Sequence, residues 1–404
     1  MEEKTMEKKS LKMLKSLPVQ LLISIILGIL AGLVLPEGAM TVVVTVKYIL
    51  SQLINFCVPL IIIGFIAPSI TQMGNNATRL LAVAVTAAYL SSVLAAFMSM
   101  GAGYAIIPHL NIAANAKDLR ELPEVAFQLD IPQIMPVMSA LVLSILLGLA
   151  TVWTKAKTIT SMLQEFQEIV LKIVRRVIIP VLPVFIAVTF CALSWQGTIT
   201  QQLPVFLIVV LIVLIGHYIW LAVLYGSASV YSRRSGLEVL KHYGPAYITA
   251  IGTMSSAATL AVALGCARKS KNLRRDLVDF GIPLFANIHL CGSVLTEVFF
   301  VMTVSGVLYG HLPTVGRMIL FCFLLGVFAI GAPGVPGGTV MASLGLITGV
   351  LGFGSDATAL MLAVFALQDS FGTACNVTGD GALTLILTGY AEKHGIQEEK
   401  AEND

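Results

Sequence analysis

Long apolar runs alternate with short polar stretches along the chain, and six of these runs are long enough to cross a bilayer as helices. They cover residues 17–36, 41–70, 78–108, 131–154, 160–195 and 201–228. The polar stretch 109–130 predicts an external loop. The first run ends in Pro-Glu-Gly without a small-x-small cleavage site, so we expect a first transmembrane helix and not a removed signal peptide.

The second half of the chain predicts two re-entrant hairpins. Residues 243–267 are apolar but are interrupted by Thr253-Met254-Ser255-Ser256, which leaves two arms that each cover about half a bilayer. Basic clusters flank both ends, so this hairpin should open from the cytoplasm. Residues 318–354 repeat the arrangement around Gly331-Ala-Pro-Gly-Val-Pro-Gly-Gly338, which cannot remain an uninterrupted helix. Its flanks carry little positive charge, so it should open from outside. Such broken helices mark the binding site of many transporters.

Four polar residues of the last apolar segment, Asp369, Thr373, Asn376 and Asp380, carry the candidate chemistry. Their offsets are i, i+4, i+7 and i+11, which places them on one stripe of a helix. A carboxylate within a bilayer costs several kcal/mol and is retained where it faces a cavity or an ion path. We interpret the stripe as the wall of a substrate and cation site.

Composition and charge agree with a membrane protein. Of the 404 residues, 57% are hydrophobic and 12% are charged, against about 25% charged in soluble domains. We therefore expect an all-α polytopic protein of the cell inner membrane. Most Lys and Arg residues lie in stretches expected inside, which predicts that both termini are cytoplasmic; the exceptions are Lys47, Lys117, Arg120 and Arg317.

The six cysteines are scattered through apolar segments, with no Cys-x-x-Cys or Cys/His metal spacing. We predict neither disulfides nor a zinc site. The only ligands expected are a small-molecule substrate, lipid and the transported Na⁺ or H⁺, with no cofactor and no nucleic acid.

Three motifs point to a family. Ser255-Ser256-Ala-Ala-Thr259, Gly334-Val-Pro-Gly-Gly338 and Asn376-Val-Thr-Gly-Asp380 resemble signature segments of the dicarboxylate/amino acid:cation symporters, the glutamate transporter homologues. The resemblance includes the opening Leu17-Pro-Val-Gln and extends over nearly the whole chain. It implies eight transmembrane helices plus two oppositely oriented re-entrant hairpins, a homotrimer and an elevator mechanism.

The resemblance also implies a division of the chain. The scaffold would comprise 1–77 with helices 1 and 2, and 109–200 with the external loop and helices 4 and 5. The transport domain would comprise 78–108 with helix 3, and 201–392 with helix 6, both hairpins and helices 7 and 8. Residues 393–404 would form a cytoplasmic tail.

Site roles follow from motif positions in the family. Asp369 would bind a substrate amino group, Thr373 and Asn376 its carboxylate region, and Ser256 and Val335 would offer main-chain contacts. The full substrate set would be Ser255, Ser256, Ser293, Val335, Thr339, Asp369, Gly372, Thr373 and Asn376. The cation set would be Asn376, Asp380, His289, Gly331, Ser91 and Ser92.

The departures from the family pattern bear on specificity. Gly372 and Met254 stand at the two positions where an arginine would meet a substrate side-chain carboxylate. This favours a neutral amino acid as substrate, with a dicarboxylate or acidic amino acid as the alternative. Cys291 stands where the family has a sodium-binding aspartate, and a thiol is a poor ligand for a hard cation. We therefore expect that ion site to be lost, although Ser91 and Ser92 remain.

Glu297 occupies the position of the proton-carrying glutamate of the mammalian glutamate transporters. With His289, which replaces an asparagine, it places two titratable groups on the predicted seventh helix. We hypothesise partial or complete proton coupling; a structural pairing of Glu297 with His289 or with a backbone group is the other interpretation.

Two other functions are weaker. An intramembrane aspartyl protease also uses membrane aspartates, but its carboxylates must share a proton, whereas Asp369 and Asp380 lie about 16 Å apart along one helix. A passive channel would show flux without accumulation. The sequence thus predicts a transporter, not an enzyme, and leaves the solute and the ion stoichiometry open.

Overall fold

The structure is a computed structural model that describes residues 17–75, 79–110, 120–132, 134–332 and 337–396. Within these residues all regular secondary structure is helical and no strand occurs, as predicted. The helices are α2 (Leu17–Val34), α3 (Glu37–Asn75), α4 (Arg79–Ile106), α5 (Val137–Thr154), α6 (Lys157–Ile173), α7 (Ile179–Gln196), α8 (Thr198–Ser232), α9 (Gly236–Leu240), α10 (Gly244–Thr253), α11 (Ser256–Ala267), α12 (Arg275–Ile288), α13 (Cys291–Tyr309), α14 (Val315–Gly331), α15 (Gly338–Gly349) and α16 (Ser355–Lys393).

Three helical segments of the described chain meet the length and composition of a membrane span: Arg79–His109, Val205–Ser232 and Arg275–Tyr309. Two bent pairs raise this number to five if each pair is one span. One pair joins Lys157–Ile178 to Pro183–Gln196 at 52°, and the other joins Ser355–Ala366 to Gln368–Lys393 at 59°. The predicted stripe from Asp369 to Asp380 lies within the second arm of the last pair.

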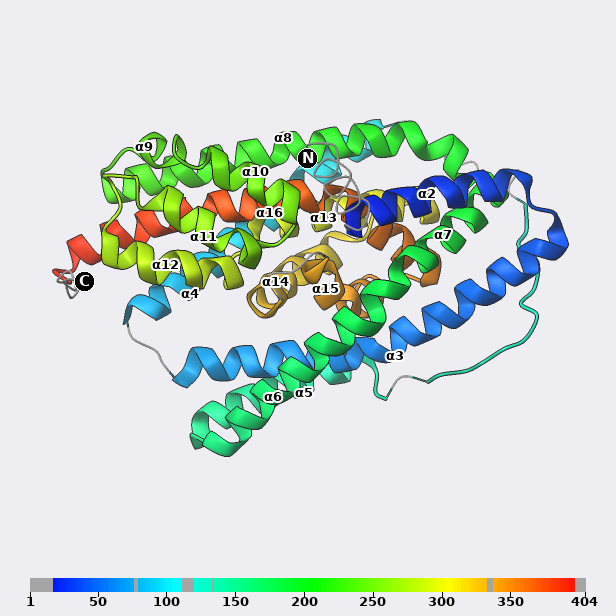
Figure 1. Cartoon of the computed structure of the whole chain (residues 1–404), viewed down its shortest axis with the longest axis horizontal. Helices are drawn as coiled ribbons and strands as arrows, with labels where there is room; N and C mark the ends of the chain where they lie inside the picture. The colour runs from blue at the N-terminus through cyan, green and yellow to red at the C-terminus, as the bar shows by residue number, and fades with distance from the viewer. Residues whose placement is uncertain (1–16, 76–78, 111–119, 133, 333–336, 397–404) are drawn as a thin grey trace, which may run out of the picture.

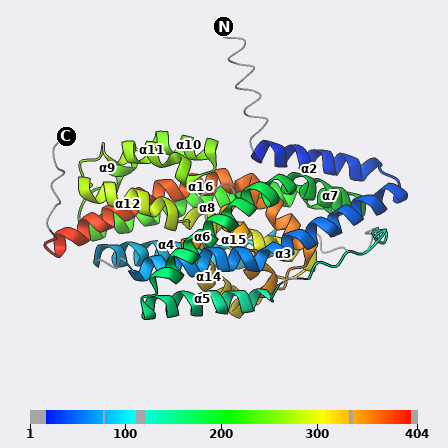
Figure 2. The same ribbon diagram turned by 60° about the horizontal axis from the view of Figure 1, so that its bottom comes forward.

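The helix contacts define two groups, which also touch each other through α3 with α14 and α15 and through α7 with α16 (Figures 1 and 2). In one group α2 packs along α7, and α3 packs against α5, α6 and α7. In the other, α16 packs against α8, α10, α12 and α13, while α4 packs against α13 and α14. Helix α16 therefore lies at the centre of the second group, where its polar stripe is shielded on several sides.

Glycine allows the closest helix contact of the first group. A Cβ atom on Gly28 would lie 2.4 Å from the carbonyl oxygen of Ala187, and one on Gly32 would lie 2.3 Å from that of Cys191. Real Cβ atoms do not approach backbone this closely, so α2 and α7 can pack at this distance only with glycine. Ser194 adds a hydrogen bond to the Ile29 carbonyl at 2.9 Å.

The first predicted hairpin is interrupted where the sequence indicates. Helix α10 ends at Thr253, Met254 has a positive φ of 51°, and Ser255 is the N-cap of α11. The Ser255 hydroxyl accepts a hydrogen bond from the Ala258 amide at 3.2 Å. Serine is a preferred N-cap because its side chain satisfies an amide that has no partner inside the helix.

The second predicted hairpin is interrupted between α14, which ends at Gly331, and α15, which begins at Gly338. Gly337 has a φ of 71°, a left-handed conformation that glycine adopts without a steric cost. The motif residues 333–336, including Val335, lie outside the described residues.

The seventh segment differs from the prediction. Instead of one helix carrying His289 and Glu297, the structure has two, because α12 ends at Ile288 and α13 begins at Cys291. His289 has an extended backbone with φ −115° and ψ 104°. No proline or serine N-cap marks this break, and its cause lies in a contact from α16 described below.

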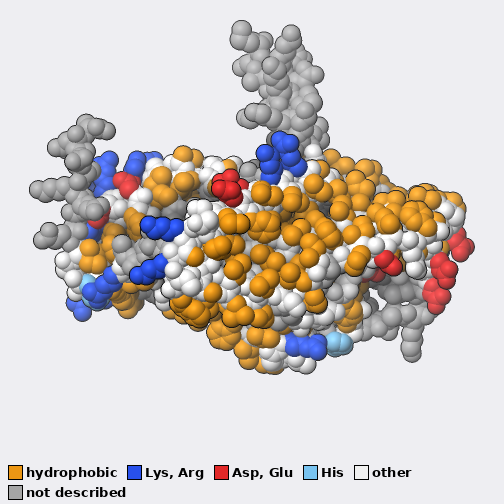
Figure 3. Space-filling model, turned by 90° about the horizontal axis from the view of Figure 1, so that it is seen from below, with side chains coloured by type: hydrophobic (Ala, Val, Ile, Leu, Met, Phe, Trp, Pro, Cys, Tyr) orange, Lys and Arg blue, Asp and Glu red, His pale blue; other side chains and the backbone are white. Residues whose placement is uncertain are grey.

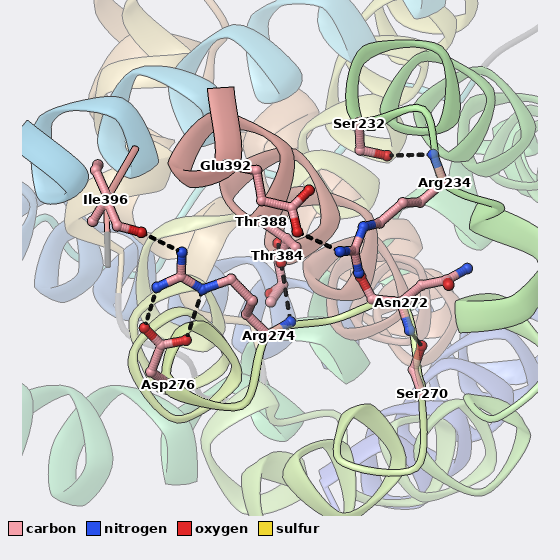
Figure 4. A network of polar contacts seen from close by, with 10 residues as sticks. All are labelled: Ser232, Arg234, Ser270, Asn272, Arg274, Asp276, Thr384, Thr388, Glu392 and Ile396. Carbon is pink, nitrogen blue, oxygen red and sulfur yellow. Dashed lines mark hydrogen bonds and ion pairs between the residues drawn. The ribbon is translucent and has the colours of Figure 1, made fainter. Parts of the chain in front are cut away.

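A polar network fastens the C-terminal part of α16 to neighbouring loops (Figure 4). Arg274 donates to both carboxylate oxygens of Asp276 and, at 2.7 Å, to the Ile396 carbonyl. Arg234 pairs with Glu392 and donates to the Asn272 carbonyl at 2.9 Å. Figure 3 shows several Lys and Arg side chains gathered near this end of the molecule, with acidic side chains at the opposite end.

Candidate functional site

The site is built around the start of α13, which lies inside the bundle. The side-chain oxygen of Asn376 accepts hydrogen bonds from the amides of Gly292 at 2.7 Å and Ser293 at 3.2 Å. Its amide nitrogen donates to the Ser293 hydroxyl at 2.9 Å. The N-cap residue Leu290 offers no capping side chain, so Asn376 of α16 replaces it. This contact gives hydrogen-bond partners to the amides at a helix break that the sequence does not reveal.

A buried hydrogen-bonded chain joins α4, the break and α16. Nδ1 of His289 lies 2.9 Å from Asp380 Oδ1, and its Nε2 lies 2.9 Å from the Ser91 hydroxyl. If Asp380 is ionised, its carboxylate only accepts, and Nδ1 is then the donor in this hydrogen bond. His289 is 0% exposed and Asp380 is 1% exposed. The second oxygen of Asp380 and the Ser92 hydroxyl have no hydrogen-bond partner among the described residues.

Asp369 connects the stripe to the second hairpin. Its Oδ2 accepts a hydrogen bond from the Gly337 amide at 2.7 Å, next to the start of α15. Asp369 and Asp380 thus have separate partners and do not share a proton, which removes the geometric basis for an aspartyl protease. Thr373 and Thr339 are also buried, at 4% and 5% exposure.

The remaining predicted residues lie on the same elements. Ser255 and Ser256 are buried at the start of α11, a helix that contacts α16. Gly331 is buried at the end of α14. A Cβ on Gly372 would lie 3.3 Å from Cα and Oγ of Ser293, so glycine here also permits close contact between α16 and α13. Gly372 therefore has a packing role as well as marking a position without the arginine of the family pattern.

Glu297 lies within α13, fully buried, and accepts a hydrogen bond from the Ser343 hydroxyl of α15. Its second oxygen has no partner among the described residues. The structure therefore does not pair Glu297 with His289, whose two ring nitrogens contact Asp380 and Ser91.

Two buried polar residues near the site were missed by the sequence analysis. Nε2 of His217, on α8, lies 3.1 Å from the Gly292 carbonyl and 2.9 Å from the Thr296 hydroxyl. Gln368 precedes Asp369 and donates to the Val210 carbonyl at 3.3 Å. A single histidine within a long apolar span was a usable signal for His217, because such residues face the bundle interior.

The arrangement brings together groups whose chemistry suits a cation and an anionic or zwitterionic solute. Carboxylate and carbonyl oxygens are the ligands that hard cations prefer, and one oxygen of Asp380 has no partner among the residues that the structure describes. The starts of α11 and α15 present backbone amides, which bind carboxylates. These features come from elements separated along the chain and meet around α16.

The comparisons with known proteins agree with this arrangement. The model of the "Sodium:dicarboxylate symporter family" matches residues 17–390. Mouse "Excitatory amino acid transporter 2" is 29% identical over 227 residues, which cover 54% of this chain and 38% of the mouse protein. Human "Excitatory amino acid transporter 1" is 27% identical over 208 residues, or 51% and 37% of the two chains.

A third relative, the Caenorhabditis elegans "Excitatory amino acid transporter", is 31% identical over 150 residues, or 36% of this chain and 29% of that protein. The chain thus spans less than two fifths of the length of the curated relatives it matches.

Replacing Asn376 tests its role at the start of α13. Asn376→Leu leaves two buried amides without an acceptor, and each unpaired group costs about 1–3 kcal/mol. We expect a clearly lower melting temperature of the purified protein in detergent. Asn376→Asp is the matched control, because it keeps an acceptor oxygen at a helix N-terminus and should lose much less stability. Equal melting temperatures for the two variants would contradict this role.

Proposed function

We propose that this chain, which belongs to the sodium:dicarboxylate symporter family, couples sodium entry to the uptake of a small dicarboxylate or acidic amino acid. The family and the relatives are transporters and not enzymes. The observation that carries the proposal is the burial of Asp369, Asn376 and Asp380 on one face of α16, each bonded to a different backbone or side-chain partner. Buried carboxylates of this kind are retained for a substrate or ion.

The acidic substrate is supported by the relatives, whose names specify excitatory amino acids. The lack of arginine at Gly372 and Met254 does not exclude it, since the amides at the starts of α11 and α15 can each receive a carboxylate. A neutral amino acid, which those two positions favour in the sequence, is the second candidate.

We further propose an elevator with eight spans and two hairpins. Counting α6 with α7 and α12 with α13 as single spans leaves α10–α11 and α14–α15 as the hairpins. The scaffold would be 1–77 and 109–200, and the moving part 78–108 and 201–392, in agreement with the two helix groups of Figure 1. Lys47 of α3 pairs with Asp356 of α16 across these groups. A homotrimer and cytoplasmic termini complete the proposal.

For the coupling ions, Asp380, Asn376 and main-chain oxygens near Gly331 are the proposed sodium ligands. The sodium site of the family that would have used Ser91 is proposed to be lost, because Ser91 contacts the His289 ring and Cys291 offers no oxygen. Glu297, buried and bonded to the second hairpin through Ser343, is the proposed proton carrier.

A substrate screen tests the function. Purified protein in sodium should be stabilised against heat by aspartate, glutamate or succinate, and less when choline replaces sodium. The stabilisation depends on the ratio of the ligand concentration to its dissociation constant. It reaches about 2.7 kcal/mol when the ligand concentration is a hundred times the dissociation constant. Stabilisation by neutral amino acids alone would instead support the second candidate, in which the substrate is a neutral amino acid. No sodium-dependent stabilisation by either class would contradict both.

Proton coupling is tested at Glu297. In proteoliposomes with a fixed sodium gradient, an inward proton gradient should increase uptake by the wild type and have no effect on Glu297→Gln, which cannot release a proton. Ser343→Ala is the matched control, because it removes the hydrogen bond but keeps the carboxyl group, and its uptake should still respond. Wild-type uptake that ignores the proton gradient would refute the idea.

A further inference from the structure

A cavity of about 580 Å³ lies outside the site, between α8, α9, α10 and α16. Four tyrosines, Tyr218, Tyr225, Tyr243 and Tyr247, contribute to its wall together with Leu221 and Leu237. The cavity follows α8 from Tyr218 to Ser229, which is about 16 Å by helical rise. None of these residues belongs to the substrate or cation set.

The cavity lies on an apolar outer face. Next to it, Val230 is 82% exposed, Leu237 74% and Ile248 71%. Val230 lies on α8 within the candidate span Val205–Ser232, and an exposed aliphatic side chain on such a helix faces lipid chains. A lipid chain can therefore reach the cavity from the side.

Two hydroxyl groups of the cavity wall lack partners. Tyr243 and Thr378 both line the cavity and are almost fully buried, and neither hydroxyl has a hydrogen-bond partner among the described residues. The neighbouring Tyr225 hydroxyl is already used, because it donates to the Thr378 carbonyl at 2.8 Å. Neither hydroxyl oxygen is accessible from the cavity, so both face the protein interior and the accessible wall of the cavity is mainly apolar.

The end of the cavity near α9 is basic. Arg233 follows Ser229 by one helical turn, is exposed, and forms no ion pair with the described residues. Lys241 follows Leu240 of the cavity wall, and its amine lies 3.5 Å from Glu238. Burial alone would raise the pKa of Glu238, but hydrogen bonds from Ser270 and His242 lower it to about 2. Glu238 therefore stays ionised and partly neutralises Lys241, which leaves Arg233 as the stronger anion partner.

We propose that this cavity binds one anionic phospholipid. An acyl chain would lie along Tyr218, Leu221 and Tyr247, which line the cavity. The phosphate would lie near Arg233, with Lys241 as a second cation. Basic residues directly beyond a membrane span are the usual partners of anionic lipid head groups.

The lipid would contact the helix that carries the transport site. Thr378 lies between Asn376 and Asp380 on α16, and a Cβ on Gly381 would lie 2.7 Å from the Tyr225 hydroxyl oxygen and from the Tyr243 ring. This part of α16 is thus held between the tyrosine wall and the site. A bound lipid would stabilise that contact whatever the transported solute is, so the inference stands independently of the proposed function.

The first experiment fills the cavity. The full-length protein is purified in detergent, incubated with phosphatidylglycerol or phosphatidylcholine, and the bound lipid per chain is counted by native mass spectrometry. We expect one retained phosphatidylglycerol on the wild type and at least a tenfold loss for Gly226→Trp. Gly226 lines the cavity, and a Cβ there meets no atom within 4 Å, so the change adds volume without a backbone clash. Val223→Trp, exposed on α8 but outside the cavity wall, should bind as the wild type.

The second experiment tests the charge. Arg233→Gln should weaken phosphatidylglycerol about fivefold, the effect of one basic residue at an anionic surface, and leave phosphatidylcholine unchanged. Arg275→Gln is the control, because Arg275 is exposed but begins α12, which contributes no residue to the cavity wall, whereas Arg233 directly follows α8. Equal retention of both lipids by the wild type, a free fatty acid instead of a phospholipid, or the same loss in Gly226→Trp and Val223→Trp would each overturn the proposal.

Discussion

The hydrogen bonds that Asn376 accepts from the amides at the start of α13 are the contact on which the rest of the site depends. A helix that begins inside a membrane domain exposes amides that water cannot satisfy, and each must find a protein partner. One side chain of α16 meets two of these amides and, through its nitrogen, the Ser293 hydroxyl. With α13 held there, His289 is extended and its ring reaches both Asp380 and Ser91. The candidate cation-binding residues and the candidate substrate-binding residues therefore lie on α16 or contact it.

The same helix also fastens the second hairpin. Asp369 accepts a hydrogen bond from the Gly337 amide, next to the start of α15. Glu297 of α13 accepts a hydrogen bond from the Ser343 hydroxyl, within α15. A solute amine that competes for Asp369 would release that amide, and protonation of Glu297 would alter the second contact. Under the proposed function, binding of solute and of ions would both act on this small set of hydrogen bonds, which would give coupling a physical route.

Much of the fold could be predicted because its signals are local. The interruption at Ser255 follows from a good N-cap, and the interruption before Gly338 follows from glycine at a positive φ. The stripe on α16 follows from helical periodicity. The break at His289 could not be predicted, because it carries no local breaker and is satisfied by a residue more than eighty positions away. The partners of His217 and Glu297 are likewise set by helix packing, which no residue pattern records. At Gly372 the sequence revealed only part of the role. We interpreted this glycine as a missing arginine, but it also permits the close packing of α16 against α13.

The central claim is that buried carboxylates on α16 join an entering cation to a solute. Its most direct measurement is the accumulation of radiolabelled aspartate or succinate, or of a neutral amino acid if only that class binds, in proteoliposomes under an inward sodium gradient. The wild type is compared with Asp369→Asn/Asp380→Asn. We predict that the wild type concentrates solute above the external level and that the double variant, although folded, does not. Undiminished accumulation by the double variant would contradict the account.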